Sequence, residues 1–540
     1  MNTKQLKDYP VWEKLKQQAE IMKQPENHLK HLILKRNRLD TCLLKGAGML
    51  YDFSHQRIDE RTMRLLFKLA ESRKIRASFT SMVSGESINV TEERAALHTA
   101  CRKFSGDPVF MDGKDIMPDI RNVRDQIKGF VSQIHSAALT GSTGKAFRHL
   151  VVIGIGGSYL GTEFVSCALQ EQAISRMKLY FLSNVDIHNF GRIVSEIEPE
   201  TTLWIVISKS FTTPETLANA RLAYEFMEKK GLALKKHFVI VTRKGGPGHH
   251  PATPKLASFD MFDFIGGRYS VTSAVGGVPL SLYLGNETFE RFLKGAEEMD
   301  RHAEETPVSK NLPLVAALLS VWNNNLLGYP AQAIIPYASP LRKLAPHIQQ
   351  LGMESNGKQV LAAGDRLDEP AGTIIFGEPG TNAQHSFFQL AHQGRPFPIE
   401  FVGVIHPRYP QYLDSSKGVT NHQELWANLI AQATALAAGR EDGSPARHFP
   451  GNRPSSTIVL ADLSPENIGR LLAFYEAKTV FEAFLWGNNP FDQFGVELGK
   501  TVADDIRQEI LTRNGNENYG FSKSDQIARY YLETLFSGQP

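Results

Sequence analysis

Short apolar runs recur through the middle of the chain at intervals of about one helix. The first group covers residues 150–153, 179–182, 203–207 and 238–241. Continuous apolar runs are typical of strands that are buried on both faces of a parallel sheet, and the intervals between them fit the helices of βαβ units. This pattern predicts a doubly wound α/β domain over residues 116–290.

A second group of apolar runs predicts a second domain of the same kind. It comprises residues 333–335, 373–376, 399–404 and 457–460. We expect this α/β domain to cover residues 310–510, again with a parallel sheet. Residues 1–115 are expected to be mostly helical, with a short edge element at 51–54, and residues 511–540 to form a C-terminal helical arm.

Composition changes this picture little. The chain has 540 residues, of which 42% are hydrophobic and 22% charged, and its net charge of +3 gives no bulk argument for a nucleic-acid or membrane partner. The three cysteines, Cys42, Cys101 and Cys167, form no CxxC pair, so neither a disulfide framework nor a zinc site is expected. The N-terminus is polar and no apolar run reaches the roughly 20 residues of a membrane span, which favours the cytoplasm.

A glycine-rich loop over residues 154–161 follows the first apolar run. Gly157 and Ser158 lie at the centre of this loop. Its glycines allow close approach of the backbone to a ligand, and the start of the following helix favours anions. Tyr159 stands where the dinucleotide fingerprint requires glycine, although Asp186 after the next run could mimic the ribose-binding acid. A nicotinamide-dependent dehydrogenase and a plain tight turn both remain alternatives.

A hydroxyl-rich loop over residues 208–216 follows the third run. It packs five hydroxyls and Lys209 into nine residues, and Thr213 and Pro214 fit the N-cap and the first position of a helix. Backbone N–H groups, the helix dipole and the serine and threonine hydroxyls of the loop would then converge, as in a small phosphate site. Ordinary helix capping is the alternative. Two such loops at strand ends of one sheet favour a ligand site at a topological switch point.

Four residues are candidates for acid–base or electrostatic roles. Arg268 follows two glycines, where a fixed cation could stabilise a developing oxyanion. Glu354 precedes an Asn-Gly turn and could point into a pocket. His385 follows a capping-box pattern at 381–384, which predicts a place in the first turn of a helix, where the dipole favours a neutral imidazole. Lys500 lies near the start of the last long helix. Taken alone, Arg268 and Lys500 also fit ion pairs, Glu354 fits a solvated loop acid, and His385 fits a hydrogen-bonded structural histidine.

Together these segments resemble the glucose-6-phosphate isomerase family. The resemblance rests on the glycine loop and on SKSFTTPET at 208–216, GGRYSVTSAVG at 266–276, MESNGK at 353–358, GTNAQH at 380–385 and FDQFGVELGK at 491–500, in the order of that family. It implies two flavodoxin-like sugar-isomerase domains and a homodimer with active sites near the subunit interface. It also implies reversible isomerisation of glucose 6-phosphate and fructose 6-phosphate without a metal or cofactor.

The resemblance also implies a role for each matching residue. Glu354 would move the proton between C2 and C1, and Arg268 would stabilise the enediolate. His385 and Lys500 would assist ring opening. The residues implied to bind the hexose 6-phosphate are Gly157, Ser158, Ser208, Lys209, Ser210, Thr213, Gln350 and Gln493. A non-catalytic sugar-phosphate sensor of the same fold stays open as an alternative.

Replacement of Ser210 by alanine tests the hydroxyl loop. We expect KM to rise with little change in kcat, because the phosphate loses a hydrogen-bond partner while the acid–base groups remain. Steady-state kinetics with fructose 6-phosphate measure both constants, and Ser210→Thr, which keeps the hydroxyl, is the control. An unchanged KM together with unchanged affinity for a phosphate inhibitor would exclude the loop from the site.

Overall fold

The computed structural model describes residues 4–174, 176–412, 418–441 and 443–539. Contacts within the chain divide it into a larger unit, residues 1–491, and a smaller unit, residues 492–540. The smaller unit contains α18 (Glu497–Gly515) and α19 (Gln526–Ser537). The division therefore falls before α18, whereas the sequence placed the start of the C-terminal arm at 511; the four-part division of the chain stays a prediction.

The first sheet consists of five parallel strands in the order β6-β5-β7-β8-β9. The four predicted runs are all strands of this sheet, and one further strand completes it: β5 (His149–Ile153), β6 (Lys178–Leu182), β7 (Thr202–Ile207), β8 (Phe238–Arg243) and β9 (Ala257–Met261). Numbered from β5, the order is 2-1-3-4-5, which is the flavodoxin-like arrangement with its switch point between the first and third strands. The doubly wound class is confirmed for this part of the chain.

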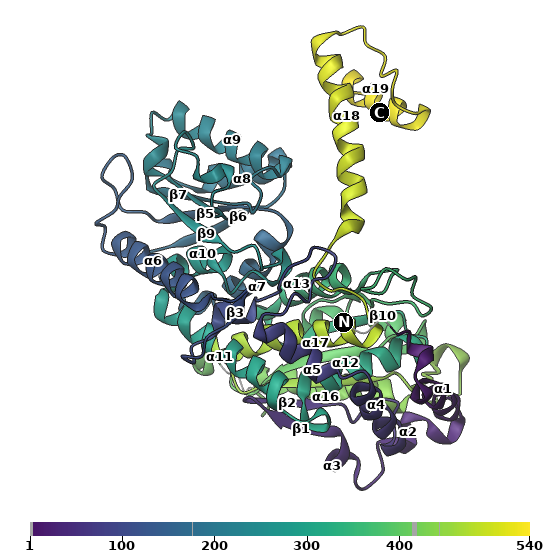
Figure 1. Cartoon of the computed structure of the whole chain (residues 1–540). Helices are drawn as coiled ribbons and strands as arrows, with labels where there is room; N and C mark the ends of the chain where they lie inside the picture. The colour runs from purple at the N-terminus through teal and green to yellow at the C-terminus, as the bar shows by residue number, and fades with distance from the viewer. Residues whose placement is uncertain (1–3, 175, 413–417, 442, 540) are drawn as a thin grey trace. The chain divides into compact units, whose positions relative to one another are not determined.

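Helices cover both faces of the first sheet (Figure 1). On one face, α8 (Ile187–Glu196) and α9 (Pro214–Lys229) pack on alternate buried side chains of β5 and β7. On the other face, α6 (Met117–His135) and α10 (Ala274–Leu284) pack on the remaining ones. Strands buried on both faces explain the continuous apolar runs in the sequence.

The second sheet has six strands in the order β1-β2-β13-β12-β10-β11. Its parallel part confirms the second group of predicted strands: β10 (Ala331–Pro336), β11 (Ile374–Phe376), β12 (Ile399–Val404) and β13 (Ser455–Leu460). Numbered from β10, these strands follow the order 2-1-3-4, so both sheets share one core order. The predicted parallel sheet is extended by an antiparallel pair of strands that the sequence did not indicate, because β2 pairs with β13 in the antiparallel direction.

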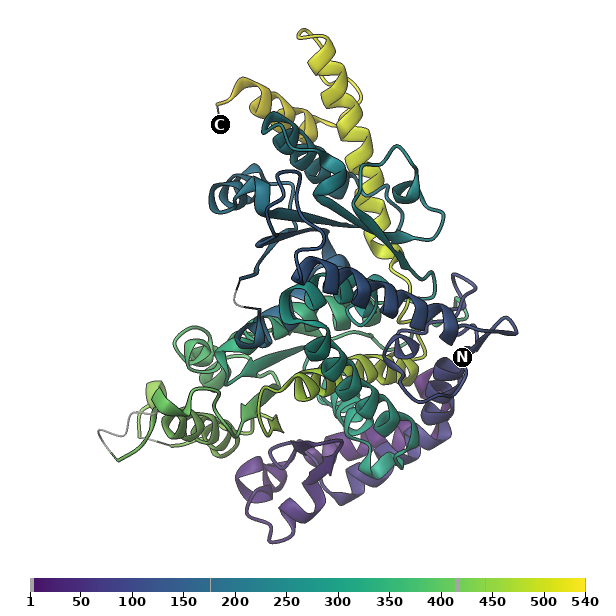
Figure 2. The ribbon, with the colours of Figure 1, turned by 90° about the vertical axis from the view of Figure 1, so that its left-hand side faces the viewer.

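The two extra strands come from the N-terminal region that was expected to be mostly helical. β1 (Leu43–Gly46) and β2 (Met49–Asp52) form a hairpin. Its two-residue turn, Ala47-Gly48, has φ of +43° and +69°, the left-handed conformation that a tight hairpin needs. Residues 51–54 were thus correctly placed near a strand, but the hairpin partner was missed. Both views show the N-terminal segment against the part of the chain that contains the second sheet (Figures 1 and 2).

The remaining helices of the larger unit surround the second sheet or join the two sheets. The long helix α17 (Pro465–Trp486) is buried along almost its whole length and packs against α11 and α12. The other helices are α1 (Pro10–Met22), α2 (Leu29–Leu32), α3 (Arg38–Cys42), α4 (Glu60–Ser72), α5 (Ile75–Ser84), α7 (Leu160–Ala168), α11 (Asn286–Glu305), α12 (Leu312–Val321), α13 (Leu344–Gln349), α14 (Gly380–Gln384), α15 (Phe388–Gln393) and α16 (Asn421–Ala438). Within the residues that the structure describes, no helix combines the length and apolar character of a bilayer span.

A buried histidine lies where the two halves of the larger unit meet. His347 of α13 is 1% exposed, and its ring stacks on Phe164 of α7 with centroids 5.8 Å apart. Among the residues that the structure describes, neither ring nitrogen finds a hydrogen-bond partner. Burial therefore lowers the pKa of His347 to about 4, because the charged form has no compensating contact.

This histidine should make the fold sensitive to acid. The unfolded chain binds a proton at this histidine below about pH 6.5, whereas the folded chain resists it down to about pH 4, so the free energy of unfolding falls as pH decreases through that window. At pH 5 the loss is about 2 kcal/mol. We expect His347→Phe to lose about 2 kcal/mol less free energy of unfolding than wild type between pH 7 and pH 5. Urea midpoints at the two pH values measure this difference, and replacement of the exposed His188 by glutamine is the control. An equal loss in His347→Phe and wild type would contradict the assignment.

Candidate active site

The glycine loop and the hydroxyl loop meet at the switch point of the first sheet. They follow β5 and β7, which are adjacent and parallel, so both loops lie at the same edge of the sheet. A cavity of about 560 Å³ opens there. It is lined by Arg94, Ile155, Ser158, Ile207, Ser208, Lys209, Ser210, Thr212, Thr213, Thr216, Arg243, Pro247 and Asp263. The sequence placed five of these residues in the site: Ser158, Ser208, Lys209, Ser210 and Thr213.

The hydroxyl loop folds through contacts among its own side chains. The hydroxyl of Ser208 accepts a hydrogen bond from the Phe211 backbone N–H at 3.0 Å, and the hydroxyl of Ser210 accepts one from the Thr212 hydroxyl at 2.7 Å. Phe211 has φ of +54°, a strained conformation for a bulky residue that is often retained at functional sites. Helix α9 begins at Pro214 with Thr213 as its N-cap, as predicted.

Positive charge predominates in the cavity lining. Among the described lining residues, Arg94, Lys209 and Arg243 are cationic and Asp263 is the one carboxylate. The Lys209 ammonium donates hydrogen bonds to the backbone carbonyls of Asp263 at 2.8 Å and Ile265 at 3.1 Å. Burial, reinforced by the charge of Arg94, lowers the pKa of Lys209 to about 8. A phosphate group, with close to two negative charges at neutral pH, would complement this lining.

The glycine loop lies directly against the segment that carries Arg268. A Cβ atom on Gly157 would lie 2.2 Å from the carbonyl carbon of Gly267 and 2.6 Å from the Arg268 nitrogen, so only glycine fits. Gly156 has φ of +57°, and a Cβ there would lie 3.1 Å from the Gln350 side-chain amide. The loop therefore contacts the cationic cavity on one side and two of the predicted site residues, Arg268 and Gln350, on the other.

Arg268 is held rigidly although it carries a charge. The residue is 3% exposed; its Nε donates to the Ser355 hydroxyl at 2.6 Å and its Nη2 to the Pro490 carbonyl. Nη1 lies 3.5 Å from Oε1 of Glu354. The Tyr269 hydroxyl lies 2.9 Å from the same Ser355 oxygen. These contacts fix one edge of the guanidinium while another edge faces the Glu354 carboxylate.

Glu354 and Gln350 lie at the two ends of a single π-helical turn, residues Gln350–Glu354, that continues α13. The Gln350 amide donates to Oε2 of Glu354 at 2.8 Å. Turns of this kind are rare and are frequent at functional sites. The Glu354 side chain is 21% exposed. A partly exposed carboxylate beside a fixed guanidinium has the geometry of a base with an adjacent anion-stabilising group.

The structure corrects the predicted setting of His385. Helix α14 starts two residues earlier than expected, with Pro379 instead of Thr381 as N-cap, and ends at Gln384, so His385 lies at the C-cap. The predicted capping box and the dipole argument for a neutral imidazole were therefore wrong. The cause is Gly380, which packs on the Tyr337 ring so closely that a Cβ would lie 2.6 Å from it, and which thereby sets the start of the helix. The His385 side chain is exposed, and in the described part of the chain no contact joins it to Glu354.

Gln493 and Lys500 belong to the smaller unit. Gln493 precedes a short 3-10 turn, Phe494–Val496. Lys500 lies in the first turn of α18, as the sequence predicted. The roles assigned to these two residues and to His385 stay predictions.

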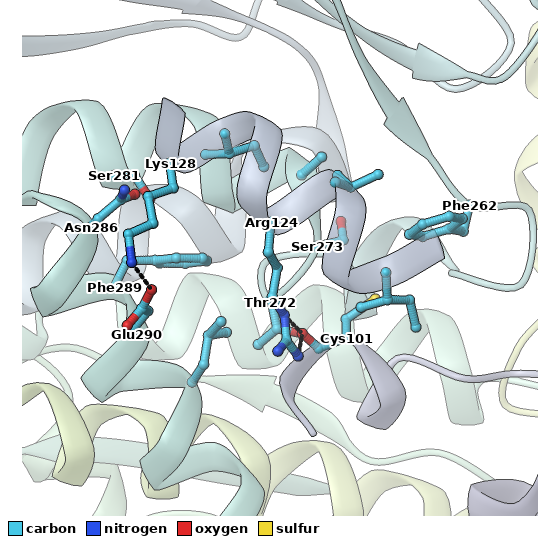
Figure 3. A pocket seen from close by; sticks show the side chains of 15 residues that line it. Cys101, Arg124, Lys128, Phe262, Thr272, Ser273, Ser281, Asn286, Phe289 and Glu290 are labelled. Atoms are coloured by element: carbon cyan, nitrogen blue, oxygen red, sulfur yellow. Dashed lines mark hydrogen bonds and ion pairs between the residues drawn. The ribbon is translucent and has the colours of Figure 1, made fainter. Parts of the chain in front are cut away.

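Two features are separate from this site. A small cavity of about 40 Å³ lies between α6, α10 and α11, next to the Lys128–Glu290 ion pair, and its lining is mostly apolar (Figure 3). It contains none of the predicted site residues.

Asp186, the candidate ribose-binding acid, caps α8, since its Oδ1 accepts hydrogen bonds from the backbone and ring of His188.

Sequence reasoning missed Arg94, Arg243 and Ser355. Arg94 stands in a charged run of a region without motifs, and only tertiary contacts bring it to the cavity. Arg243 closes β8, and its place at the carboxyl end of a strand was the available signal. Ser355 follows Glu354 directly, but nothing in the sequence shows that it turns toward Arg268.

The fold and the site define a doubly wound α/β protein with a cationic, hydroxyl-lined cavity at its switch point and a guanidinium–carboxylate pair next to the glycine loop. A phosphoglucose isomerase family model matches residues 52–527, and the chain belongs to that family. A glucose-6-phosphate isomerase of Desulfosudis oleivorans is 58% identical over 99% of each chain, and a cytosolic one of Arabidopsis thaliana is 42% identical over 98% of this chain and 97% of the relative. The crystal structure of a glucose-6-phosphate isomerase from Chlamydia trachomatis has a TM-score of 0.89 at 37% identity, covering 99% of both chains.

The lowered pKa of Lys209 predicts a pH dependence of anion binding. As pH rises through about 8, Lys209 in the unliganded protein loses its proton and the cavity loses a positive charge, so the dissociation constant for inorganic phosphate should rise. Phosphate itself is already close to doubly charged there. Calorimetry between about pH 7 and pH 9.5 measures the change, and Lys209→Arg, whose guanidinium keeps its charge, should flatten it. A rise of equal size in Lys209→Arg would contradict the assignment.

Proposed function

We propose that this protein catalyses the reversible isomerisation of glucose 6-phosphate and fructose 6-phosphate, a step of glycolysis and gluconeogenesis. Family membership and the names of the relatives support the reaction. The observation that carries the proposal is the contact of one glycine loop with both the cationic cavity and the Arg268–Glu354 pair. We infer that one sugar phosphate spans both parts of the site.

The phosphate binds in the cavity of the hydroxyl loop. Ser158, Ser208, Ser210 and Thr213 supply hydroxyls, and the start of α9 supplies backbone N–H groups and the positive end of its dipole. Lys209 adds positive charge. Binding energy at this remote group positions the reacting carbons, which is how a non-reacting part of a substrate contributes to catalysis.

Isomerisation uses one carboxylate. Glu354 removes the proton from C2 and returns it to C1, while charge develops on the oxygens of the enediolate. Arg268 stabilises that charge from a position that is fixed before the reaction, so no reorganisation is needed. Gln350, which donates to the Glu354 carboxylate, keeps the base oriented. This chemistry needs only groups of the chain, and we infer that it proceeds without a metal or cofactor.

Ring opening precedes this step and needs a proton on the ring oxygen and a base for the anomeric hydroxyl. His385 and Lys500 perform this work, and Gln493 binds the sugar, by their match to the family motifs. We infer a homodimer in the cytosol with sites near the subunit interface. The plant relatives named as cytosolic support the location.

The two alternative functions are less well supported. Tyr159 replaces the third fingerprint glycine, and Asp186 is engaged at the start of α8, which disfavours a nicotinamide site. A non-catalytic sensor would not need a fixed guanidinium facing a carboxylate. A coupled assay that follows glucose 6-phosphate formation from fructose 6-phosphate separates an isomerase from both.

Glu354→Gln tests the base directly. The amide keeps the shape of the side chain but cannot accept the proton, so we expect kcat to fall by about 10²- to 10⁴-fold with little change in inhibitor binding. The coupled assay measures turnover, and titration with a phosphate-bearing inhibitor measures binding. Glu163→Gln, which removes a carboxylate paired with Lys343 outside the site, is the control. Near-wild-type turnover in Glu354→Gln would refute the base assignment.

A further inference from the structure

A segment of the N-terminal region, residues 89–98, is built into the walls of the active site. The Leu97 backbone N–H donates to the Phe264 carbonyl at 3.0 Å, and the buried His98 ring packs on Tyr269 with centroids 4.7 Å apart. At its other end, the Asn89 side-chain oxygen accepts a hydrogen bond from Asn489 at 2.8 Å. The segment thus contacts the residues on both sides of Arg268 and those just before Pro490, which itself accepts a hydrogen bond from Arg268.

Arg94 is the charged residue of this segment that reaches the cavity. Its guanidinium lines the cavity beside Ser208 and Lys209. Nη1 donates to the Asp263 carbonyl at 2.9 Å, and Nη2 pairs with Glu92 at 2.6 Å. The Asp263 carbonyl also accepts the Lys209 ammonium at 2.8 Å. Two cations from distant parts of the sequence therefore hold one carbonyl oxygen.

That carbonyl begins the segment that leads to Arg268. Residues 263–268 are fixed at the start by Arg94 and Lys209, in the middle by Lys209 on Ile265, and at the end by Gly157. A shift of Arg94 or Lys209 toward a bound anion would therefore pull on the backbone that aims Arg268. The cationic cavity and the Arg268–Glu354 pair are therefore connected through the backbone of residues 263–268 as well as through the glycine loop.

The balance of charged side chains at the cavity also supports a role for Arg94 in anion binding. The cavity has three cations, and counting Glu92 behind Arg94 with Asp263 leaves two carboxylates against them. Loss of Arg94 lowers this excess by one positive charge. An arginine fork holds a carbonyl, a carboxylate and a phosphate oxygen in fixed directions, whereas the lysine ammonium is a point charge on a flexible stem.

We propose that Arg94 is a further residue of the substrate site, which both supplies positive charge for the phosphate and positions Arg268 through the 263–268 segment. This inference rests on the proposed function. It gives the N-terminal region, for which the sequence indicated no role, a part in binding and catalysis.

The test compares Arg94→Met, Arg94→Lys and wild type in the full-length protein. For Arg94→Met we expect the dissociation constant of inorganic phosphate, measured by calorimetry, to rise roughly tenfold, the loss of one charge-assisted contact. We also expect kcat with saturating fructose 6-phosphate to fall roughly fivefold or more, because small displacements of a catalytic group are costly. Arg94→Lys keeps the charge, so it should bind phosphate nearly as wild type does but retain the lowered kcat.

Lys244→Met is the matched control. Lys244 is exposed, follows β8 and does not line the cavity, so its loss should change neither constant. Circular dichroism and urea midpoints verify folding; if Arg94→Met does not fold, Arg94→Lys carries the test through its kcat. A wild-type kcat in a folded Arg94 variant, or a phosphate affinity in Arg94→Met equal to that of wild type, would overturn the inference. An inactive wild type would instead remove the proposed function, because phosphate binding is measured without turnover.

Discussion

The active site depends on one backbone contact in which no side chain fits. Gly157 of the first glycine loop lies against the peptide that joins Gly267 to Arg268, at a distance where even a methyl group would overlap. The Ser270 hydroxyl closes the same contact by donating to the Gly157 carbonyl at 3.2 Å. Through this contact, the loop that follows β5 of the first sheet fixes the position of Arg268. The Arg268 guanidinium in turn faces the carboxylate of Glu354 on the π-helical turn. Everything proposed about catalysis requires these two backbones to touch.

Three consecutive residues at the end of the π-helical turn each make a different contact. Glu354 faces Arg268 and stays partly exposed, Ser355 accepts from Arg268, and Asn356 donates to Glu482 of α17 at 3.0 Å. Glu482 in turn pairs with Lys478 at 3.0 Å in the interior. Buried charges are costly unless they are paired and hydrogen-bonded, and removing one partner leaves the other uncompensated. The proposed base is therefore carried by a turn whose next residues are anchored in the long, buried helix α17.

The sequence was informative where the physics is local. Strands buried on both faces give continuous apolar runs, so the eight predicted strands were found; Thr213-Pro214 marked the start of α9 correctly because capping depends on adjacent residues. The β1–β2 hairpin was missed because its pairing with β13 depends on a distant part of the chain. The setting of His385 was misjudged because a tertiary contact at Gly380 moved the start of the helix. Arg94 carries no local signal at all, since only the folded chain brings it to Asp263.

The place of the β1–β2 hairpin also orders events during synthesis. All five strands of the first sheet lie between His149 and Met261, so that sheet can assemble from a continuous stretch soon after it leaves the ribosome. The second sheet cannot close in this way, because Asp52 pairs with Thr457. Strands made among the first must remain unpaired at one edge until nearly the whole chain has emerged, a long-range pairing of the kind that slows folding and exposes strand edges to aggregation. The nascent chain is therefore most vulnerable in its N-terminal hairpin.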